Sequence, residues 1–162
     1  MTGRPLRSIV ALAMSAGTAC SLSPTAPDAP PGVTLSPSFE QRVITLVNQQ
    51  RAGGANCSQA VGPLASDSNV GRAARDHSID MATNNYFSHT SLDGRTFGQR
   101  MPDAGYTGQP LAENIAVGQS SPEAVMATWM ASPDHCSNIM HAAGRDIGVG
   151  YANGYWTLMV GG

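Results

Sequence analysis

Two histidines and one glutamate, His89, Glu113 and His135, are the side chains of this sequence best suited to chemistry. Imidazole and carboxylate groups bind divalent metals and transfer protons near neutral pH. Successive members of this trio are more than twenty positions apart, so no single helix or turn can bring them together. Only a fold that returns on itself could place them in one site.

Helix caps and apolar periodicity predict the elements that must position the trio. The segment Ser121-Pro122-Glu123 is typical of a helix start, with a capping serine, proline in the first turn and an acid beside it. Apolar positions at helical spacing predict further helices. The expected helical segments are about 37–52, 68–84, 95–104, one beginning at 122 and a turn beginning at 133.

Three strands are predicted, at 111–117, 147–151 and 155–160. The last two flank Asn153-Gly154, a dipeptide that favours a tight hairpin turn. Helices and strands are mixed along the chain and do not alternate regularly, which favours an α+β fold over a doubly wound parallel sheet.

Two polar residues stand at positions that are otherwise apolar. Glu113 interrupts the strand at 111–117, and because an unpaired buried charge costs several kcal/mol, we expect it to have a partner. His77 lies on the apolar face of the helix at 68–84. We interpret it as a core histidine with a hydrogen-bonded nitrogen, with metal ligation as the alternative.

Length and charge narrow the classes of function. A chain of 162 residues allows one domain with short extensions. The net charge of -2 and the charged fraction of 12% provide no basic surface for nucleic acid. No apolar run reaches the roughly 18 residues of a membrane span, so we expect membrane association only through a lipid anchor.

The N-terminus predicts export. Arg4 and Arg7 precede an apolar stretch and small residues, so 1–19 is typical of a signal peptide. Cys20 follows directly and resembles the lipidated cysteine of bacterial lipoproteins, which leaves two alternatives, a lipoprotein of the cell envelope or a freely secreted protein. Segment 20–37 is rich in proline and predicts an extended tether. The folded domain is expected at 38–162.

Three cysteines in an exported chain leave one unpaired after a disulfide forms. Lipidation of Cys20 would account for it, and Cys57 and Cys136 would then be joined. Two free buried thiols are the alternative, but exported proteins usually oxidise such pairs. A bridge to Cys136 would also restrain the segment that carries His135.

Five motifs in order resemble a bacterial member of the CAP superfamily, which contains SCP-like domains of cysteine-rich secretory, venom antigen and plant pathogenesis-related proteins. The resemblance covers about 39–160. It implies a three-layer α-β-α sandwich with a small antiparallel sheet, and a cleft where His89, Glu113 and His135 meet. The motifs lie at 74–94, 104–106, 113–118, 121–140 and 147–150.

The sequence departs from the family pattern where a second acid is usual, because Ser132 lies near that position. Three interpretations of the trio stay open. Glu113 could accept hydrogen bonds from His89 and His135 in a purely structural network. The trio could bind zinc or another divalent cation with water completing the shell. It could also be catalytic, with a metal-activated water.

Two classes of function follow from the resemblance. The favoured one is an exported binding module for a lipid or sterol, a cell-surface polymer or a protein. The alternative is an extracellular metal-dependent hydrolase or protease that uses the same cleft. The sequence contains neither a Gly-x-Ser-x-Gly motif nor a His-Glu-x-x-His motif, which weighs against the second class.

Apolar residues flank the cleft segments and could line a lipid groove, although we expect them to be core. They are Tyr86, Phe87, Phe97, Met101, Tyr106 and Met140.

Overall fold

The computed structural model describes Met1 and residues 29–162. The proposed signal peptide, Cys20 and most of the tether lie outside the described residues. Five helices and four strands follow in the order α1 (Pro37–Gly53), β1 (Ala65–Ser66), α2 (Ser68–Asn84), α3 (Phe97–Asp103), β2 (Pro110–Val117), α4 (Pro122–Ala131), α5 (Pro133–Ile139), β3 (Asp146–Ala152) and β4 (Tyr155–Gly161).

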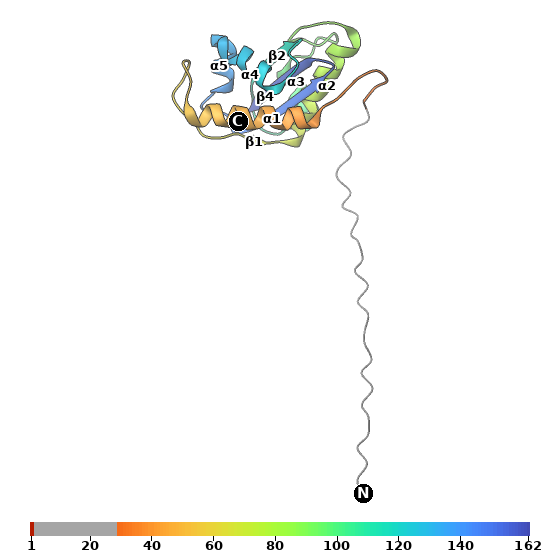
Figure 1. Ribbon diagram of the computed structural model, residues 1–162. Coiled ribbons are helices and arrows are strands. Elements are labelled where there is room, and N and C mark those ends of the chain that lie inside the picture. Colours follow the sequence, from red (N-terminus) through yellow and green to blue (C-terminus); the bar gives the residue numbers. More distant parts are fainter. Residues whose placement is uncertain (2–28) are drawn as a thin grey trace.

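The strands form one sheet in the order β1-β3-β4-β2, with helices on both faces (Figure 1). Strands β2, β4 and β3 are antiparallel, as the sequence predicts, and β1 adds two residues parallel to β3. Strand β1 was not predicted because two residues are too few for a period-two pattern. The α+β class and the α-β-α sandwich are confirmed.

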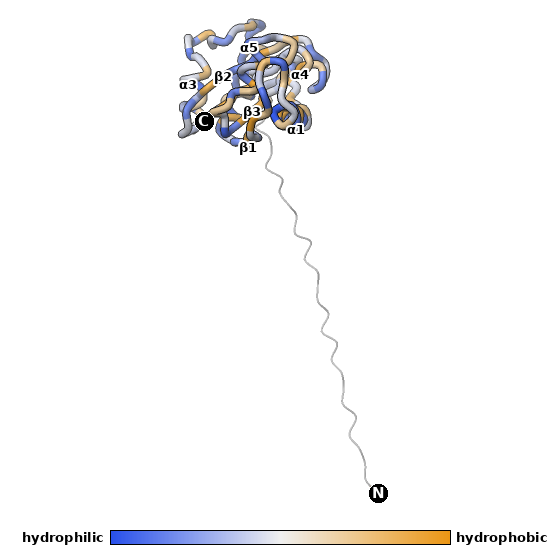
Figure 2. The backbone as a smooth tube through the Cα atoms, turned by 90° about the vertical axis from the view of Figure 1, so that its left-hand side faces the viewer, coloured by the Kyte–Doolittle hydropathy of each residue, from blue (hydrophilic) through white to orange (hydrophobic). Residues whose placement is uncertain are grey.

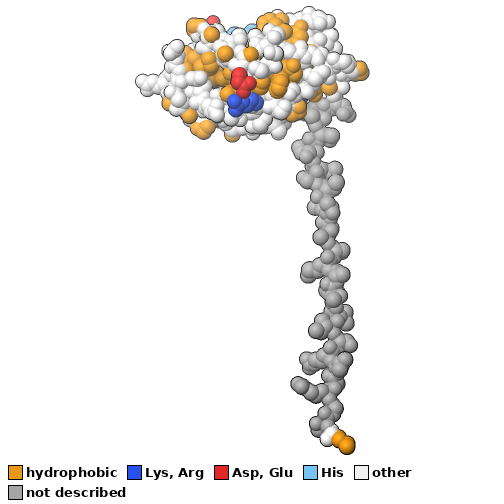
Figure 3. All heavy atoms as spheres, viewed as in Figure 1, with side chains coloured by type: hydrophobic (Ala, Val, Ile, Leu, Met, Phe, Trp, Pro, Cys, Tyr) orange, Lys and Arg blue, Asp and Glu red, His pale blue; other side chains and the backbone are white. Residues whose placement is uncertain are grey.

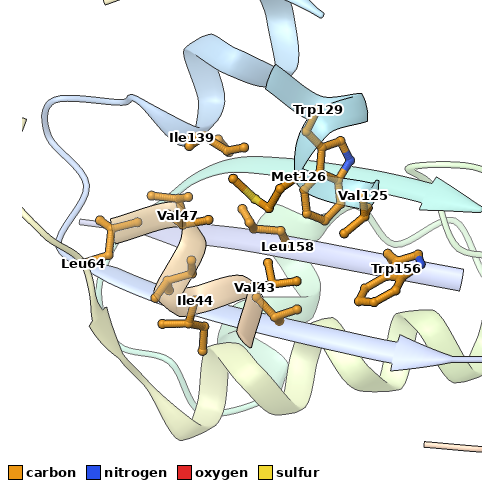
Figure 4. Packing of buried hydrophobic residues seen from close by; sticks show 14 of the residues in the cluster. Val43, Ile44, Val47, Leu64, Val125, Met126, Trp129, Ile139, Trp156 and Leu158 are labelled. Carbon is orange, nitrogen blue, oxygen red and sulfur yellow. The ribbon is translucent and has the colours of Figure 1, made fainter. Parts of the chain in front are cut away.

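Two apolar clusters hold the three layers together. The larger cluster lies between one face of the sheet and helices α1, α4 and α5 (Figure 4). The smaller one lies between the other face and helices α2 and α3. Along the helices, hydrophobic positions alternate with hydrophilic ones, as expected for helices with one buried side (Figure 2). Strand β2, which carries Glu113, is the last strand in the sheet order and so forms an edge, with helices on both of its faces.

Helix α2 packs directly on the backbone of β3 at two glycines. A Cβ atom at Gly148 would lie 2.2 Å from the backbone carbon of Val70, and one at Gly150 would lie 2.4 Å from the carbonyl oxygen of Ala74. No side chain fits into those gaps. The close contact fixes α2, which carries His77, relative to the sheet.

The hairpin and the disulfide are both as predicted. Asn153 and Gly154 have positive φ angles of 47° and 85° and join β3 to β4. Cys57 and Cys136 form a disulfide that links the loop after α1 to α5. The backbone of Thr34 exchanges hydrogen bonds with Asn153, so the end of the predicted tether is bound to the domain.

Most of the apolar residues near the cleft belong to the core. Met101, Tyr106 and Met140 are buried, and Tyr86 and Phe97 are half-buried. Phe87 is the exception, with 51% of its surface exposed, because it lies in the loop after α2.

Charged side chains are sparse on the face shown in Figure 3. Among the described residues, no helix is long and apolar enough to cross a membrane.

Candidate functional site

Glu113 and Asn114 are neighbours in β2 that belong to opposite faces of the sheet. Glu113 is paired with Met159, which packs against α2 and α3, whereas Asn114 is paired with Leu158 in the cluster of α1, α4 and α5. Side chains alternate between faces along a strand. The carboxylate of Glu113 therefore lies toward one helical layer, and the amide of Asn114 lies toward the other.

The Glu113 carboxylate is fully buried and has two cationic or polar partners. The Nδ1 atom of His89 lies 2.8 Å from its Oε1 atom. Arg100, in α3, donates from Nη2 to Oε2 at 2.5 Å, and this arginine is only 5% exposed. A buried charge is tolerated when it is paired and hydrogen-bonded. The partner that the sequence required is therefore chiefly Arg100.

Backbone carbonyl groups hold Arg100 in place. Its Nη1 atom donates to the carbonyl of Arg95 at 2.7 Å and to that of His89 at 3.1 Å. A capping box between Thr96 and Gln99 fixes the start of the short helix α3. The guanidinium thus connects the loop that carries His89 to the edge strand.

The contact with Glu113 determines the tautomer of His89. A carboxylate only accepts hydrogen bonds, so Nδ1 of His89 carries the proton. In the neutral imidazole, Nε2 is then an acceptor. The side chain of His89 is 55% exposed, whereas that of Glu113 is 0% exposed. The oriented imidazole, not the carboxylate, is the group that a ligand can reach.

His77 extends this arrangement into the core. Its Nε2 atom donates to the carbonyl of Ser88 at 2.9 Å, and the Ser91 hydroxyl lies 3.3 Å from Nδ1. Ser91 also accepts from Arg100 at 3.0 Å. Burial and the Arg100 charge lower the pKa of His77, so the ring is neutral at pH 7. The prediction of a hydrogen-bonded core histidine is confirmed.

We call these five side chains the arginine network: His77, His89, Ser91, Arg100 and Glu113.

His135 lies in α5, which packs against β2. Its Nδ1 atom is buried and has no hydrogen-bond partner among the described residues. Burial, and secondarily the nearby His89, lowers the pKa of His135. The amide of Asn114 donates to the carbonyl of His135 at 3.0 Å, so it is the backbone here that is held.

Asn138 completes this second set of contacts. Its Nδ2 atom donates to Oδ1 of Asn114 at 2.9 Å and to the carbonyl of Glu113 at 3.2 Å. We call Asn114, Asn138 and the His135 backbone the asparagine network. It attaches α5 to β2 without using a charged side chain.

The structure corrects one expectation about the trio. Glu113 accepts from His89 and Arg100, not from both histidines, and its two carboxylate oxygens are bonded to these two residues. No group of three or more His, Cys, Asp or Glu side chains in the described part of the chain is arranged to hold a metal. Both Glu113 oxygens are already bonded to protein donors. As placed, the trio does not fit a divalent ion, and zinc binding stays a prediction.

A cleft of about 310 Å³ lies over His89 and Glu113. It combines hydroxyl and amide groups with three apolar side chains, as small-ligand sites commonly do. Its lining residues are His89, Thr90, Thr96, Phe97, Leu111, Ala112, Glu113 and Asn138. His135 is not among them.

Arg100 and Asn138 are the site residues that sequence reasoning missed. The sequence did indicate that Glu113 needs a partner, and Arg100 lies in a segment predicted to be helical. An arginine in an exposed-looking helix is usually solvated, however, and only the return of α3 to β2 makes it the counter-ion. Asn114, which directly follows Glu113, is visible in the sequence as a second polar residue in an apolar strand, but its contact with α5 is not.

Comparisons with known proteins agree with this architecture. Residues 44–159 match the model of a family described as the cysteine-rich secretory protein family, CAP. The uncharacterized protein YkwD of Bacillus subtilis is 32% identical over 96% of this chain, which spans 61% of that relative.

Two solved structures are also similar. An extracellular protein with an SCP domain from Bacillus anthracis is 30% identical, with a TM-score of 0.71 over 76% of this chain and 40% of the other. A cysteine-rich secretory protein from Staphylococcus aureus is 17% identical, with a TM-score of 0.63. The match covers 76% of this chain and 38% of the S. aureus chain.

Proposed function

The chain belongs to the cysteine-rich secretory protein (CAP) family, and we propose that it is an exported binding module whose ligand contacts the His89 cleft. The ligand would be a cell-surface polymer, a lipid or a protein segment. Export is supported by the signal-like N-terminus and by the B. anthracis relative, which is described as extracellular. A metal has no part in this proposal.

The state of Glu113 is the observation that carries the proposal. Its carboxylate is buried, and its two oxygens are bonded to Arg100 and His89. Because both oxygens are engaged by protein donors in the interior, the carboxylate is not exposed to a substrate. The arrangement instead orients His89 and presents its Nε2 atom to the cleft, which is the role of a fixed hydrogen-bond acceptor in a binding site.

A hydrolase is the second candidate, favoured by the same His89–Glu113 pair. A histidine oriented by a carboxylate through Nδ1 has Nε2 available as a general base. In that case a water deprotonated by His89 would attack the substrate. The open cleft and the exposure of His89 provide access.

Substitution of the two histidines separates the candidates. We expect the purified wild-type protein and His89→Ala to show the same background level of hydrolysis of peptide, ester and glycoside substrates. His135→Ala is the matched control, because His135 does not line the cleft. Suppose that the wild type hydrolyses a substrate, that His89→Ala lowers the rate at least a hundredfold and that His135→Ala does not. This result would contradict the binding-module proposal and support the hydrolase.

A zinc titration tests the metal hypothesis separately. Because Glu113 is bonded to Arg100, we expect calorimetry to find no zinc binding tighter than millimolar at pH 7. Micromolar binding that is lost in His89→Ala and in His135→Ala would show that the cleft rearranges around a metal.

Lipid anchoring is proposed at Cys20, with free secretion as the alternative. We expect the wild type to fractionate with membranes and Cys20→Ser to be released in soluble form. Equal release of both proteins would identify a freely secreted protein.

A further inference from the structure

A second cleft, of about 360 Å³, lies on the other side of Arg100 between α2 and α3. The residues at its base are buried, among them His77, Ser91 and Arg100. Its margin is formed by exposed or half-buried charged residues of α2, α3 and the loop between them. These are Arg72, Asp76, Asp80, Asp93, Arg95 and Asp103. The volume is in the range of sites for small ligands.

The base of this cleft contains a buried donor without an acceptor. The Nε atom of Arg100 has no hydrogen-bond partner among the described residues, although both terminal nitrogens of the same side chain are bonded. Buried N–H groups are almost always paired with protein, water or ligand. An oxygen atom of a bound molecule would satisfy it.

The margin has an excess of negative charge. The margin contains four aspartates and two arginines, Arg72 and Arg95. Arg100 is not counted because its charge is paired with that of Glu113. Arg95 is shared between Asp93 and Asp103. Asp80 accepts hydrogen bonds from Asn84 and Tyr86.

Asp76 differs from the other three aspartates. No described residue donates a hydrogen bond to its side chain or lies within ion-pair distance of it, although the charges of Arg72, Arg75 and Arg95 act on it and it lines the cleft at the middle of α2. Its carboxylate is therefore available to a ligand cation.

We propose that the α2–α3 cleft binds a small polar ligand that carries a primary ammonium group and a hydroxyl or carbonyl oxygen. Asp76 pairs with the ammonium group, and the oxygen accepts from Arg100 at the base. An amino sugar and the amino terminus of a peptide both have this chemistry. The site is separate from the His89 cleft, so it does not depend on the function proposed there.

Amide chemical shifts of the protein, measured by NMR during titration, test the proposal. The probes are glucosamine for the sugar source and serine amide for the peptide source, each compared with its N-acetylated form, which lacks the charge. We expect one of the two amines to shift the amides of Ala73, Ser91 and Leu92 in a saturable way, and its acetylated form to bind at least about threefold more weakly.

Variants of Asp76 make the test specific. Asp76→Asn removes the charge with little change of shape and should weaken amine binding about threefold, and Asp76→Lys should abolish it. Glu123→Gln is the matched control, an exposed acid on α4 that pairs with Arg42. The proposal is overturned if neither amine saturates, if the acetylated forms bind equally well, or if Asp76→Lys binds like the wild type.

Discussion

The arginine network and the asparagine network meet at the same edge strand, yet they hold their histidines in opposite ways. In the arginine network a buried carboxylate bonds directly to the His89 ring, and a buried guanidinium holds the carboxylate. In the asparagine network only the backbone of His135 is bonded, and the nearby disulfide ties α5 to the loop after α1. One histidine is fixed by charge, whereas the other is fixed through its helix.

This difference separates function from scaffolding. Removing one member of a buried, charged network lowers the stability of the fold strongly, but the complete network fixes a single orientation of the His89 ring. A covalent and amide-based attachment is less specific for the ring and tolerates change in the side chain. We infer that His89 is the group selected for a defined orientation, and that His135 follows the position of α5.

Loss of Arg100 should have the largest effect on this comparison. Arg100→Met leaves the Glu113 carboxylate buried beside His89 alone, and we expect unfolding to become easier by about 3–5 kcal/mol. Urea denaturation measures the change. Arg42→Met, which breaks the exposed pair with Glu123, should change the unfolding free energy little, because solvent screens that pair. Equal effects of the two substitutions would contradict a special role for the buried pair.

Removal of the disulfide should affect the other half of the site. The bridge spans 79 positions, and the chain-entropy model assigns about 4 kcal/mol to a loop of that length, with measured values often lower. We expect Cys57→Ser combined with Cys136→Ser to lower the melting temperature and to shift NMR signals of α5. If the ring signals of His89 move as much as those of His135, the two networks are not independent.

Acidification should destabilise the fold through two histidines. Burial lowers the pKa of His77 and of His135 in the folded protein, so the unfolded chain binds more protons than the folded one below a pH of about 6.5. Stability is therefore retained at neutral pH and declines as the pH falls. Urea denaturation at several pH values measures the slope. We expect His135→Gln to reduce it, and an unchanged slope would show that His135 is solvated.

Asn138→Ala should have the smallest effect, about 1 kcal/mol, because two neutral hydrogen bonds at a half-buried position are lost. Thermal unfolding measures it. Thr128→Ala, on the exposed side of α4, is the control. A loss as large as that in Arg100→Met would make the asparagine network the stronger attachment.

The sequence predicted most of the fold because the signals were local. The capping serine before α4 and the Asn153-Gly154 turn each specify structure within a few residues. The family motifs then identified the layers. Strand β1 was missed because its two residues pair with residues 81 positions later, which no local pattern can indicate.

The site was predicted in part. His89 and Glu113 do meet, and the need of Glu113 for a partner followed from the cost of a buried charge. That partner, Arg100, could not be identified because the choice depends on which helix packs against which face of β2. The alternation of Glu113 and Asn114 along the strand explains why Asn114, and not Glu113, bonds the backbone of α5 through its side chain.

The tautomer of His89 tests the central claim most directly. Long-range ¹H–¹⁵N NMR correlation at pH 8 distinguishes a proton on Nδ1 from one on Nε2. The account predicts Nδ1–H in the wild type, with Nε2 as an acceptor towards the cleft, and loss of that preference in Glu113→Leu. A wild-type His89 protonated on Nε2, or a tautomer unchanged in Glu113→Leu, would contradict it.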